Sequence, residues 1–186
     1  MDDFRALLAS ESAPIGSITE YQLDLLEQHY RLLCKWNKRM NLTRIRSVRE
    51  AVQFHYCESL FLAHWLPKGE LRIADVGSGA GFPGIPVAVL RPDCTIDLIE
   101  SHQRKAAFLR EACRQLPNVN VISKRAEECT GRYDWMVSRA VRVGDVLKLK
   151  LAPRLALLIG ADDAKGLEAL KVPWGERRIL AFHVEQ

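Results

Sequence analysis

The sequence lacks a long apolar run, since none of its stretches approaches the ~20 consecutive apolar residues that a membrane-spanning helix needs. Its opening residues, MDDFRALLASES, are acidic and lack the basic start of a secretory signal peptide. Internal repeats and low-complexity segments are absent as well. These absences predict a cytoplasmic protein with no membrane partner.

Cysteine is present, but in no pattern that would bind a metal or build a disulfide framework. The five cysteines are Cys34, Cys57, Cys94, Cys113 and Cys129, and no two form a C-x-x-C pair. The five histidines show no metal-ligand spacing either. We therefore expect reduced thiols that mostly pack in the interior, and no bound metal.

The length and composition fit an ordinary globular chain. With 186 residues, 48% hydrophobic and 27% charged, it is long enough for one compact domain with a small extension. The net charge of +4 is mild, but the segment KWNKRMNLTRIRSVR at 35–49 contains no acidic residue. Such a segment is compatible with nucleic-acid binding and, equally, with a solvated helix face.

Two capping boxes mark helices in the first third of the chain. Thr19 and Gln22 precede apolar residues at helical spacing, in which Trp36 is expected to be core rather than a stacking platform. Ser47 and Glu50 open a second helix toward residue 66. The polar segment between the two helices is expected to be a loop or a helix end.

From residue 71 onward, short apolar runs alternate with amphipathic segments, which is typical of a doubly wound, mostly parallel α/β sheet. The strands are expected at 71–76, 95–100, 119–123, 133–138, 155–160 and 177–185. Helices are expected at 84–90, at 102–116 with Ser101 as the cap, and near 143–151.

The stretch DVGSGAGFPGIP at 75–86 follows the first expected strand, where α/β sheets bind ligands. It lacks the Lys-Ser/Thr pair of a phosphate-binding P-loop. It also lacks the third glycine of a dinucleotide fingerprint, because Phe82 stands at that position. Gly77 and Gly79 remove side chains that would block a ligand, and Asp75 suits a ligand with an ammonium group.

Acidic residues lie at the ends of the first three expected strands of the core. Glu100 ends the second strand, where a carboxylate can accept both hydroxyls of a ribose, and Glu127 follows the third. Each alone would be read as a surface charge. Together with Asp75 they favour S-adenosylmethionine as the cofactor.

Several segments resemble the RsmG (GidB) family of small-subunit ribosomal RNA methyltransferases. The segments are KWNKRMNLT, DVGSGAGFPGIPVAVLRP, LIESHQRKAAFL, RAEE and VSRA. The resemblance implies a Rossmann-like class I methyltransferase core (68–186) with an RNA-facing helical extension (1–67). It also implies transfer of a methyl group from S-adenosylmethionine to guanine N7 in 16S RNA or the small subunit. We expect a monomer.

The resemblance assigns roles to individual residues. It implies that the cofactor is lined by Gly77, Phe82, Ala126, Glu127 and Arg139, which Asp75, Gly79 and Glu100 join from the spacing above. It implies RNA contacts at Asn41, Thr43, His55, Lys105, Arg125 and Arg139. For His55 a structural role, and for Lys105 a solvated helix face, are equally expected.

Arg139 is the residue expected to position the substrate, because an arginine at a strand end can present a bidentate fork to guanine O6 or to phosphate. No general base is expected, since guanine N7 has no proton to lose. Ile159 stands where the family has a lysine before Gly160. The chain is expected to be shortened after residue 160, which leaves open the number of strands. Two other functions also stay open: a non-catalytic RNA-binding module that keeps the methyltransferase fold, and a methyltransferase for another substrate.

Overall fold

A seven-stranded sheet organises the computed structural model of the chain, which describes residues 3–139, 141–164, 168–175 and 178–184. The strand order is β3-β2-β1-β4-β5-β7-β6. The strands are β1 (Arg72–Val76), β2 (Thr95–Ile99), β3 (Val119–Ile122), β4 (Trp135–Arg139), β5 (Arg154–Gly160), β6 (Glu168–Lys171) and β7 (Arg178–Val184). β1 to β5 are parallel and β7 is antiparallel to both of its neighbours.

The helical segments are α1 (Phe4–Glu11), α2 (Glu20–Met40), α3 (Val48–Ala51), the π-helix η1 (Val52–Cys57), α4 (Glu58–Trp65), α5 (Gly84–Leu90), α6 (Gln103–Ala112) and α7 (Val143–Val146). Short 3₁₀ turns lie at η2 (Ala126–Glu128) and η3 (Ala161–Ala164). In α2 the predicted capping box is formed in both directions between Thr19 and Gln22. At α3, Ser47 caps Glu50 as predicted, but the Glu50 carboxylate accepts from the Arg46 amide.

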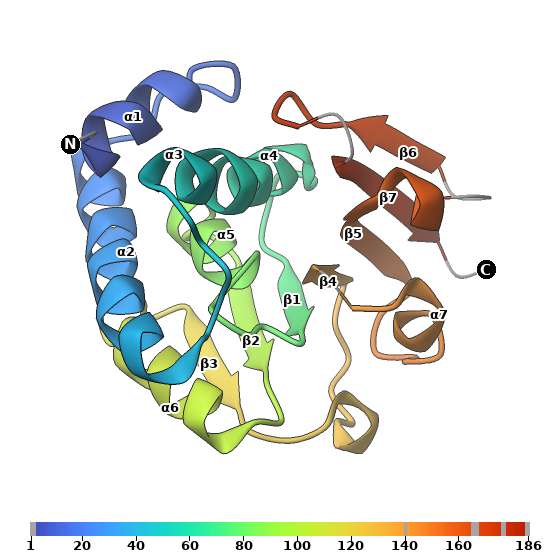
Figure 1. Ribbon diagram of the computed structural model, residues 1–186. Helices are drawn as coiled ribbons and strands as arrows, with labels where there is room; N and C mark the ends of the chain where they lie inside the picture. The colour runs from blue at the N-terminus through green and yellow to red at the C-terminus, as the bar shows by residue number, and fades with distance from the viewer. Residues whose placement is uncertain (1–2, 140, 165–167, 176–177, 185–186) are drawn as a thin grey trace.

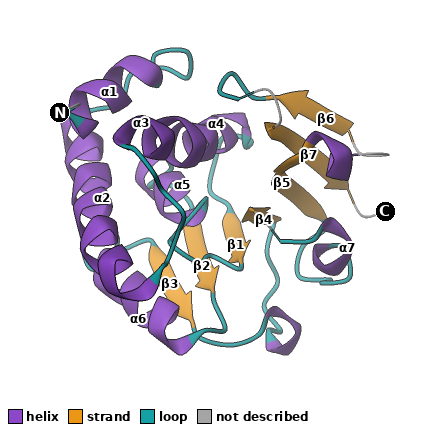
Figure 2. Cartoon of the chain, in the orientation of Figure 1, coloured by secondary structure: helices purple, strands orange, loops and turns teal. Residues whose placement is uncertain are grey.

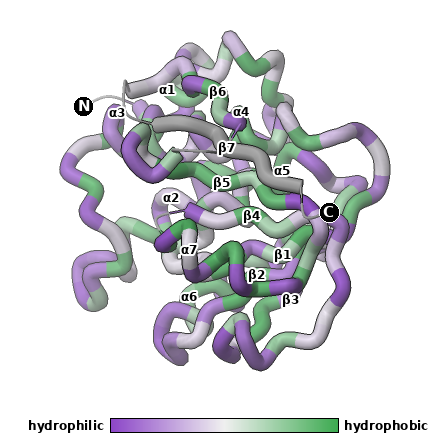
Figure 3. The backbone as a smooth tube through the Cα atoms, turned by 90° about the vertical axis from the view of Figure 1, so that its right-hand side faces the viewer, coloured by the Kyte–Doolittle hydropathy of each residue, from purple (hydrophilic) through white to green (hydrophobic). Residues whose placement is uncertain are grey.

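The two faces of the sheet are covered unequally (Figures 1 and 2). Helices α1 to α6 share one hydrophobic core with one face of the sheet, in which Leu26, Leu60 and Phe108 are fully or almost fully buried. The other face packs against α7 and neighbouring loops through a smaller cluster that includes Val76 and Met136. In Figure 3 the hydrophobic colour follows β5 clearly.

The predicted α/β fold class is confirmed, and each expected strand is present. The last was expected at 177–185 and is observed at 178–184, with residues 177 and 185 outside the described part. β6 was not predicted, and it raises the sheet to seven strands.

Three helix predictions need correction. α7 is a single turn rather than a helix to residue 151. Ser101 does not cap α6, because the N-cap is His102 and the Glu100 carboxylate accepts its amide proton. Between β5 and β6 the described residues contain only the 3₁₀ turn η3, as the short C-terminal part suggested.

Candidate functional site at the carboxyl edge of the sheet

A hollow of about 200 Å³ lies at the edge where the parallel strands end. Its lining comes from the last residues of β1 and β2 and from the segments after β1, β2, β3 and β4: Val76, Gly77, Ile99, Glu100, Ser101, Lys124, Arg125, Ala126, Glu127, Val141, Asp145 and Leu149. The structure therefore brings together four predicted cofactor residues, Gly77, Glu100, Ala126 and Glu127. Arg125, which the resemblance placed on the RNA side, also lies in this lining.

Side-chain alternation along the strands explains why other predicted cofactor residues are elsewhere. Successive side chains of a strand point to opposite faces. Val76 and Ile99 belong to the α7 face, which carries the hollow. Asp75 and Arg139 alternate with them and point to the face that α4 and α5 cover.

Asp75 holds the turn together instead of lining the hollow. Its side chain is fully buried, and Oδ2 accepts the Gly84 amide proton at 3.0 Å, at the start of α5. Burial raises the pKa of Asp75 to about 7, against the opposing hydrogen bond from Gly84. The carboxyl thus occupies the helix N-terminus that a bound phosphate would need. This is the physical reason why the turn is not a phosphate loop.

Glu100 links the glycine turn to α6. One carboxylate oxygen accepts from the Gly79 amide at 2.9 Å and the other from the His102 amide at 2.8 Å. The side chain is nearly buried, yet the residue lines the hollow. Each oxygen keeps a second lone pair, so the carboxylate is held in place with acceptor capacity left over. Gly79 has a positive φ of 57° and belongs to the same constellation.

His29, which was not predicted, contacts the backbone of the glycine turn. His29 on α2 is buried, with Nε2 3.0 Å from the Ala80 carbonyl oxygen and Nδ1 2.8 Å from the Tyr56 hydroxyl. Because a carbonyl only accepts, Nε2 carries the proton and Nδ1 accepts from Tyr56. Burial lowers the pKa of His29 to about 4, so the ring is neutral. Its place on the apolar face of α2, three residues after Leu26, was the available signal.

Phe82 packs into the interior rather than against the hollow. Its ring lies 5.3 Å from His29, 5.0 Å from His55 and 5.0 Å from Tyr56, measured between ring centroids. The residue is 6% exposed. Phe82 therefore packs the turn against α2 and η1, and its contact with a cofactor stays a prediction. His55 is half-buried on η1 beside it.

Arg139 ends β4 at the same edge, on the opposite side of the sheet from the hollow. Its Nε lies 3.8 Å from Oε2 of Glu58, the first residue of α4. Glu58 is fully buried, and sequence reasoning missed it. A lone acidic residue inside the apolar stretch from 51 to 66 was the signal that could have found it.

The WNK and NLT motifs build the end of α2. Asn41 has a left-handed φ of 48° and is the C-cap of the helix. The Asn37 side chain holds the backbone of Thr43 through two hydrogen bonds of 2.9 Å. Trp36 packs on Phe108, as expected of a core residue, and its ring nitrogen donates to Glu111.

The basic segment lies at the site's edge of the molecule. α2 runs antiparallel to α6, because Gln28 bonds Gln115 while Trp36 meets the middle of α6. The end of α2 therefore lies near the start of α6, which carries Lys105 and follows the strand end at Glu100 (Figure 1). The exposed basic side chains of this surface are Lys35, Lys38, Arg39, Arg44, Arg46 and Arg104.

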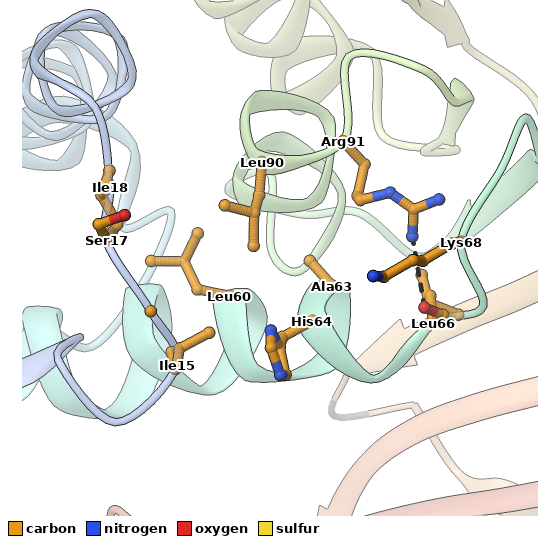
Figure 4. A pocket seen from close by; sticks show the side chains of 11 residues that line it. Ile15, Ser17, Ile18, Leu60, Ala63, His64, Leu66, Lys68, Leu90 and Arg91 are labelled. Atoms are coloured by element: carbon orange, nitrogen blue, oxygen red, sulfur yellow. Dashed lines mark hydrogen bonds between the residues drawn. The ribbon is translucent and has the colours of Figure 1, made fainter.

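A second hollow lies at the opposite edge, where α4 and α5 end and β2 begins (Figure 4). Leu60 and Leu90 line its apolar part, and His64, Lys68 and Arg91 surround them. The Arg91 guanidinium is already bonded to Asp93 and to backbone carbonyls. This hollow is separate from the glycine turn and its acidic partners.

Among the helices in the described ranges, none combines the length and the apolar character that crossing a membrane requires. The same residues contain no group of three or more His, Cys, Asp and Glu side chains placed to hold a metal ion.

The strand order, the antiparallel β7 and the glycine turn facing an acidic β2 end define the Rossmann-like fold of class I methyltransferases. Magnesium protoporphyrin IX methyltransferase from Synechocystis, solved with bound SAH, shares this fold. The TM-score is 0.59 at 14% identity, over 86% of this chain and all of that one.

The family is shown by sequence. The family model for GidB, rRNA small subunit methyltransferase G, matches residues 22–158, and the chain belongs to this family, as its motifs predicted. Ribosomal RNA small subunit methyltransferase G of Chromobacterium violaceum is 42% identical over 66% of this chain and 60% of its own length. Ribosomal RNA small subunit methyltransferase G 1 of Syntrophobacter fumaroxidans is 38% identical over 75% and 67%, respectively. The chain thus spans about three fifths to two thirds of these relatives.

Proposed function

We propose that the chain is an S-adenosylmethionine-dependent methyltransferase that forms N7-methylguanosine in small-subunit ribosomal RNA. One observation carries the proposal: in a chain of the GidB family, Gly77, Glu100, Ala126 and Glu127 meet in one hollow at the carboxyl edge of a class I methyltransferase sheet. On this proposal the protein works as a monomer in the cytoplasm, with the small-subunit RNA or the assembled subunit as its partner.

The residues of the hollow suit this cofactor. Glu100 and Glu127 offer carboxylate acceptors for ribose hydroxyls and an adenine amino group, and apolar Val76, Ile99 and Leu149 offer a surface for the adenine ring. Gly77 lines the hollow without a side chain, and a Cβ there would lie 2.8 Å from Cγ2 of Val141, which lines the same hollow. When bound, the cofactor supplies an activated methyl group on a sulfonium centre.

The chemistry requires alignment rather than proton removal. Guanine N7 carries an exposed lone pair, so the chain has to place that nitrogen in line with the methyl group and exclude water. Arg139, at the end of β4, is the residue proposed to position the base or its phosphate. The basic surface at the ends of α2 and α6, with Asn41, Thr43, His55, Lys105 and Arg125 around it, is proposed to face the RNA.

A matched pair of variants tests the cofactor part. Glu127 and Glu128 are both exposed neighbours in η2, but only Glu127 lines the hollow. We expect Glu127→Ala to weaken S-adenosylmethionine binding about tenfold or more by calorimetry, because a charge-assisted hydrogen bond contributes about 1.5–3 kcal/mol. Glu128→Ala is expected to bind like the wild type. Equal affinities for the two variants would contradict the proposed site.

A radiolabelled assay tests the reaction. Small subunits and naked 16S RNA from cells that lack this protein are incubated with labelled cofactor, and N7-methylguanosine is mapped in the product. The second candidate function, an RNA-binding module without turnover, is favoured by the short connection between β5 and β6. RNA binding without methyl transfer in this assay would support that alternative.

A further inference from the structure

Glu58 is a buried acidic residue at the start of α4. It is fully buried, as are its helix neighbours Leu60 and Leu62. Removing a carboxylate from water costs several kcal/mol unless a cation or hydrogen bonds compensate it. The nearby cation is Arg139, whose Nε lies 3.8 Å from Oε2 and whose side chain is 9% exposed. Hydrophobic packing alone would favour an apolar residue at position 58, so the charge requires another reason.

The position of the pair supplies that reason. Arg139 is the last residue of β4, and Ser138 before it bonds the Val76 carbonyl, one residue before the glycine turn. Glu58 directly follows the π-helix η1, and single π-helical turns are frequently found at functional sites. η1 also places His55 against Phe82 of the turn. The ion pair therefore lies where the helical extension meets the reactive edge.

We propose that Glu58 is a positioning residue that fixes the guanidinium of Arg139 for the substrate guanosine. This inference rests on the proposed function and names a residue that acts through Arg139. Because Arg139 and Glu58 lie on the α4 face while the hollow lies on the α7 face, we expect the pair to act on the substrate side.

The test compares Glu58→Gln with Glu58→Asp. Glu58→Gln keeps the size and removes the charge, and we expect kcat for methylation of small-subunit RNA to fall about 10- to 100-fold, the loss that a misplaced group causes. The Kd for S-adenosylmethionine is expected to stay within twofold. Glu58→Asp keeps the carboxylate, and we expect it to retain most of the kcat that Glu58→Gln loses. Ser59→Ala, a buried polar change one residue away, is the control and keeps wild-type kcat.

A double-variant cycle keeps the test valid if Glu58→Gln folds poorly. In the Arg139→Gln background, Glu58→Gln is expected to cause no further loss of kcat, because the residue it positions is gone. This double variant also avoids a lone buried cation. Additive losses, or a parallel loss of cofactor affinity, would overturn the inference. A wild-type protein that methylates no RNA would instead refute the proposed function.

Discussion

At the scale of single residues, Gly77, Gly79 and Gly84 of the turn each have a separate physical task. Gly77 lines the hollow, Gly79 donates its amide to Glu100, and Gly84 donates to Asp75. Asp75 was expected beside the cofactor, but the alternation of β1 turns it toward α5. The turn is therefore shaped by internal hydrogen bonds, and on the proposed function the cofactor would meet its outer side.

Gly84→Ala tests how tightly this arrangement is packed. A Cβ at Gly84 would lie 2.5 Å from Oδ2 of Asp75 and 2.3 Å from Cδ2 of Leu98. We expect the free energy of unfolding to fall by about 2 kcal/mol or more, as overpacking of a core requires. Gly144→Ala is the matched control, because nothing lies within 4 Å of a Cβ there. In the α7 turn it is expected to be neutral or to stabilise by up to about 1 kcal/mol. Urea unfolding measures both, and equal effects would contradict the packing described here.

His29 predicts a loss of stability in acid. Its pKa is about 4 in the folded protein, below its ordinary value near 6.5, so the unfolded chain binds the proton first. The contribution of the neutral ring is complete above pH 6.5 and is lost as the pH falls toward 4, by about 3 kcal/mol in total.

Asp75 acts in the opposite sense: its raised pKa adds stability at low pH, and that stability is lost as the pH rises through about 7.

A comparison of variants separates the two groups. His29→Gln keeps a donor for the Ala80 carbonyl and removes the titration, while Asp75 is unchanged. Between pH 7 and pH 4.5, we expect the free energy of unfolding of His29→Gln to fall by about 2 kcal/mol less than that of the wild type. His64→Gln, at an exposed histidine, controls for the loss of a histidine and keeps the wild-type profile. Parallel profiles for wild type and His29→Gln would exclude the assignment.

Among the structural elements, the end of α2 shows how a family motif can serve the fold. Asn41 takes the left-handed conformation that ends the helix, and Asn37 holds the following loop through Thr43. The resemblance assigned Asn41 and Thr43 to RNA. The backbone contacts give both residues a local task that needs no RNA, and the two roles can be tested separately.

Asn41→Gly and Asn41→Ala separate structure from recognition. Glycine accepts a φ of 48° without cost, whereas alanine there loses about 1–2 kcal/mol. We expect thermal unfolding to show near-wild-type stability for Asn41→Gly and a clear loss for Asn41→Ala. If the amide also contacts RNA, Asn41→Gly loses RNA affinity while it stays folded. An alanine variant as stable as the glycine variant would contradict the cap.

The sequence predicted the elements well where local chemistry decides them. The capping box at Thr19 and Gln22 and the apolar runs of β1, β2 and β5 are local signals, and all are confirmed. β6 was missed because, within the described residues, it pairs only with β7, and the segment EALK gives no local sign of that pairing. Glu58 and His29 were missed for the same reason: their partners, Arg139 and Ala80, lie 81 and 51 residues away.

For the whole molecule, the unequal cover of the sheet decides where partners can approach. Helices α1 to α6 cover one face of the sheet. The other face is covered by α7 and loops, and the hollow lies on this side. The basic end of α2 and the start of α6 lie on the face that α1 to α6 cover, at the same edge as the hollow (Figure 1). On the proposed function, RNA bound to this basic surface would reach the end of β4 from the side of the helical extension.

Salt dependence tests this docking direction. Arg44 and Arg46 are exposed in the loop after α2, and we expect Arg44→Gln/Arg46→Gln to weaken RNA binding uniformly across sequences. The slope of log K against log salt is expected to drop by about 0.7–0.9 for each lost phosphate contact.

Arg31→Gln/Arg132→Gln removes the same charge elsewhere: Arg31 already pairs with Glu27, and Arg132 precedes β4 at the opposite edge. Filter binding at several salt concentrations measures both slopes. If the control pair lowered the slope as much as the loop pair, net charge rather than this surface would carry the binding.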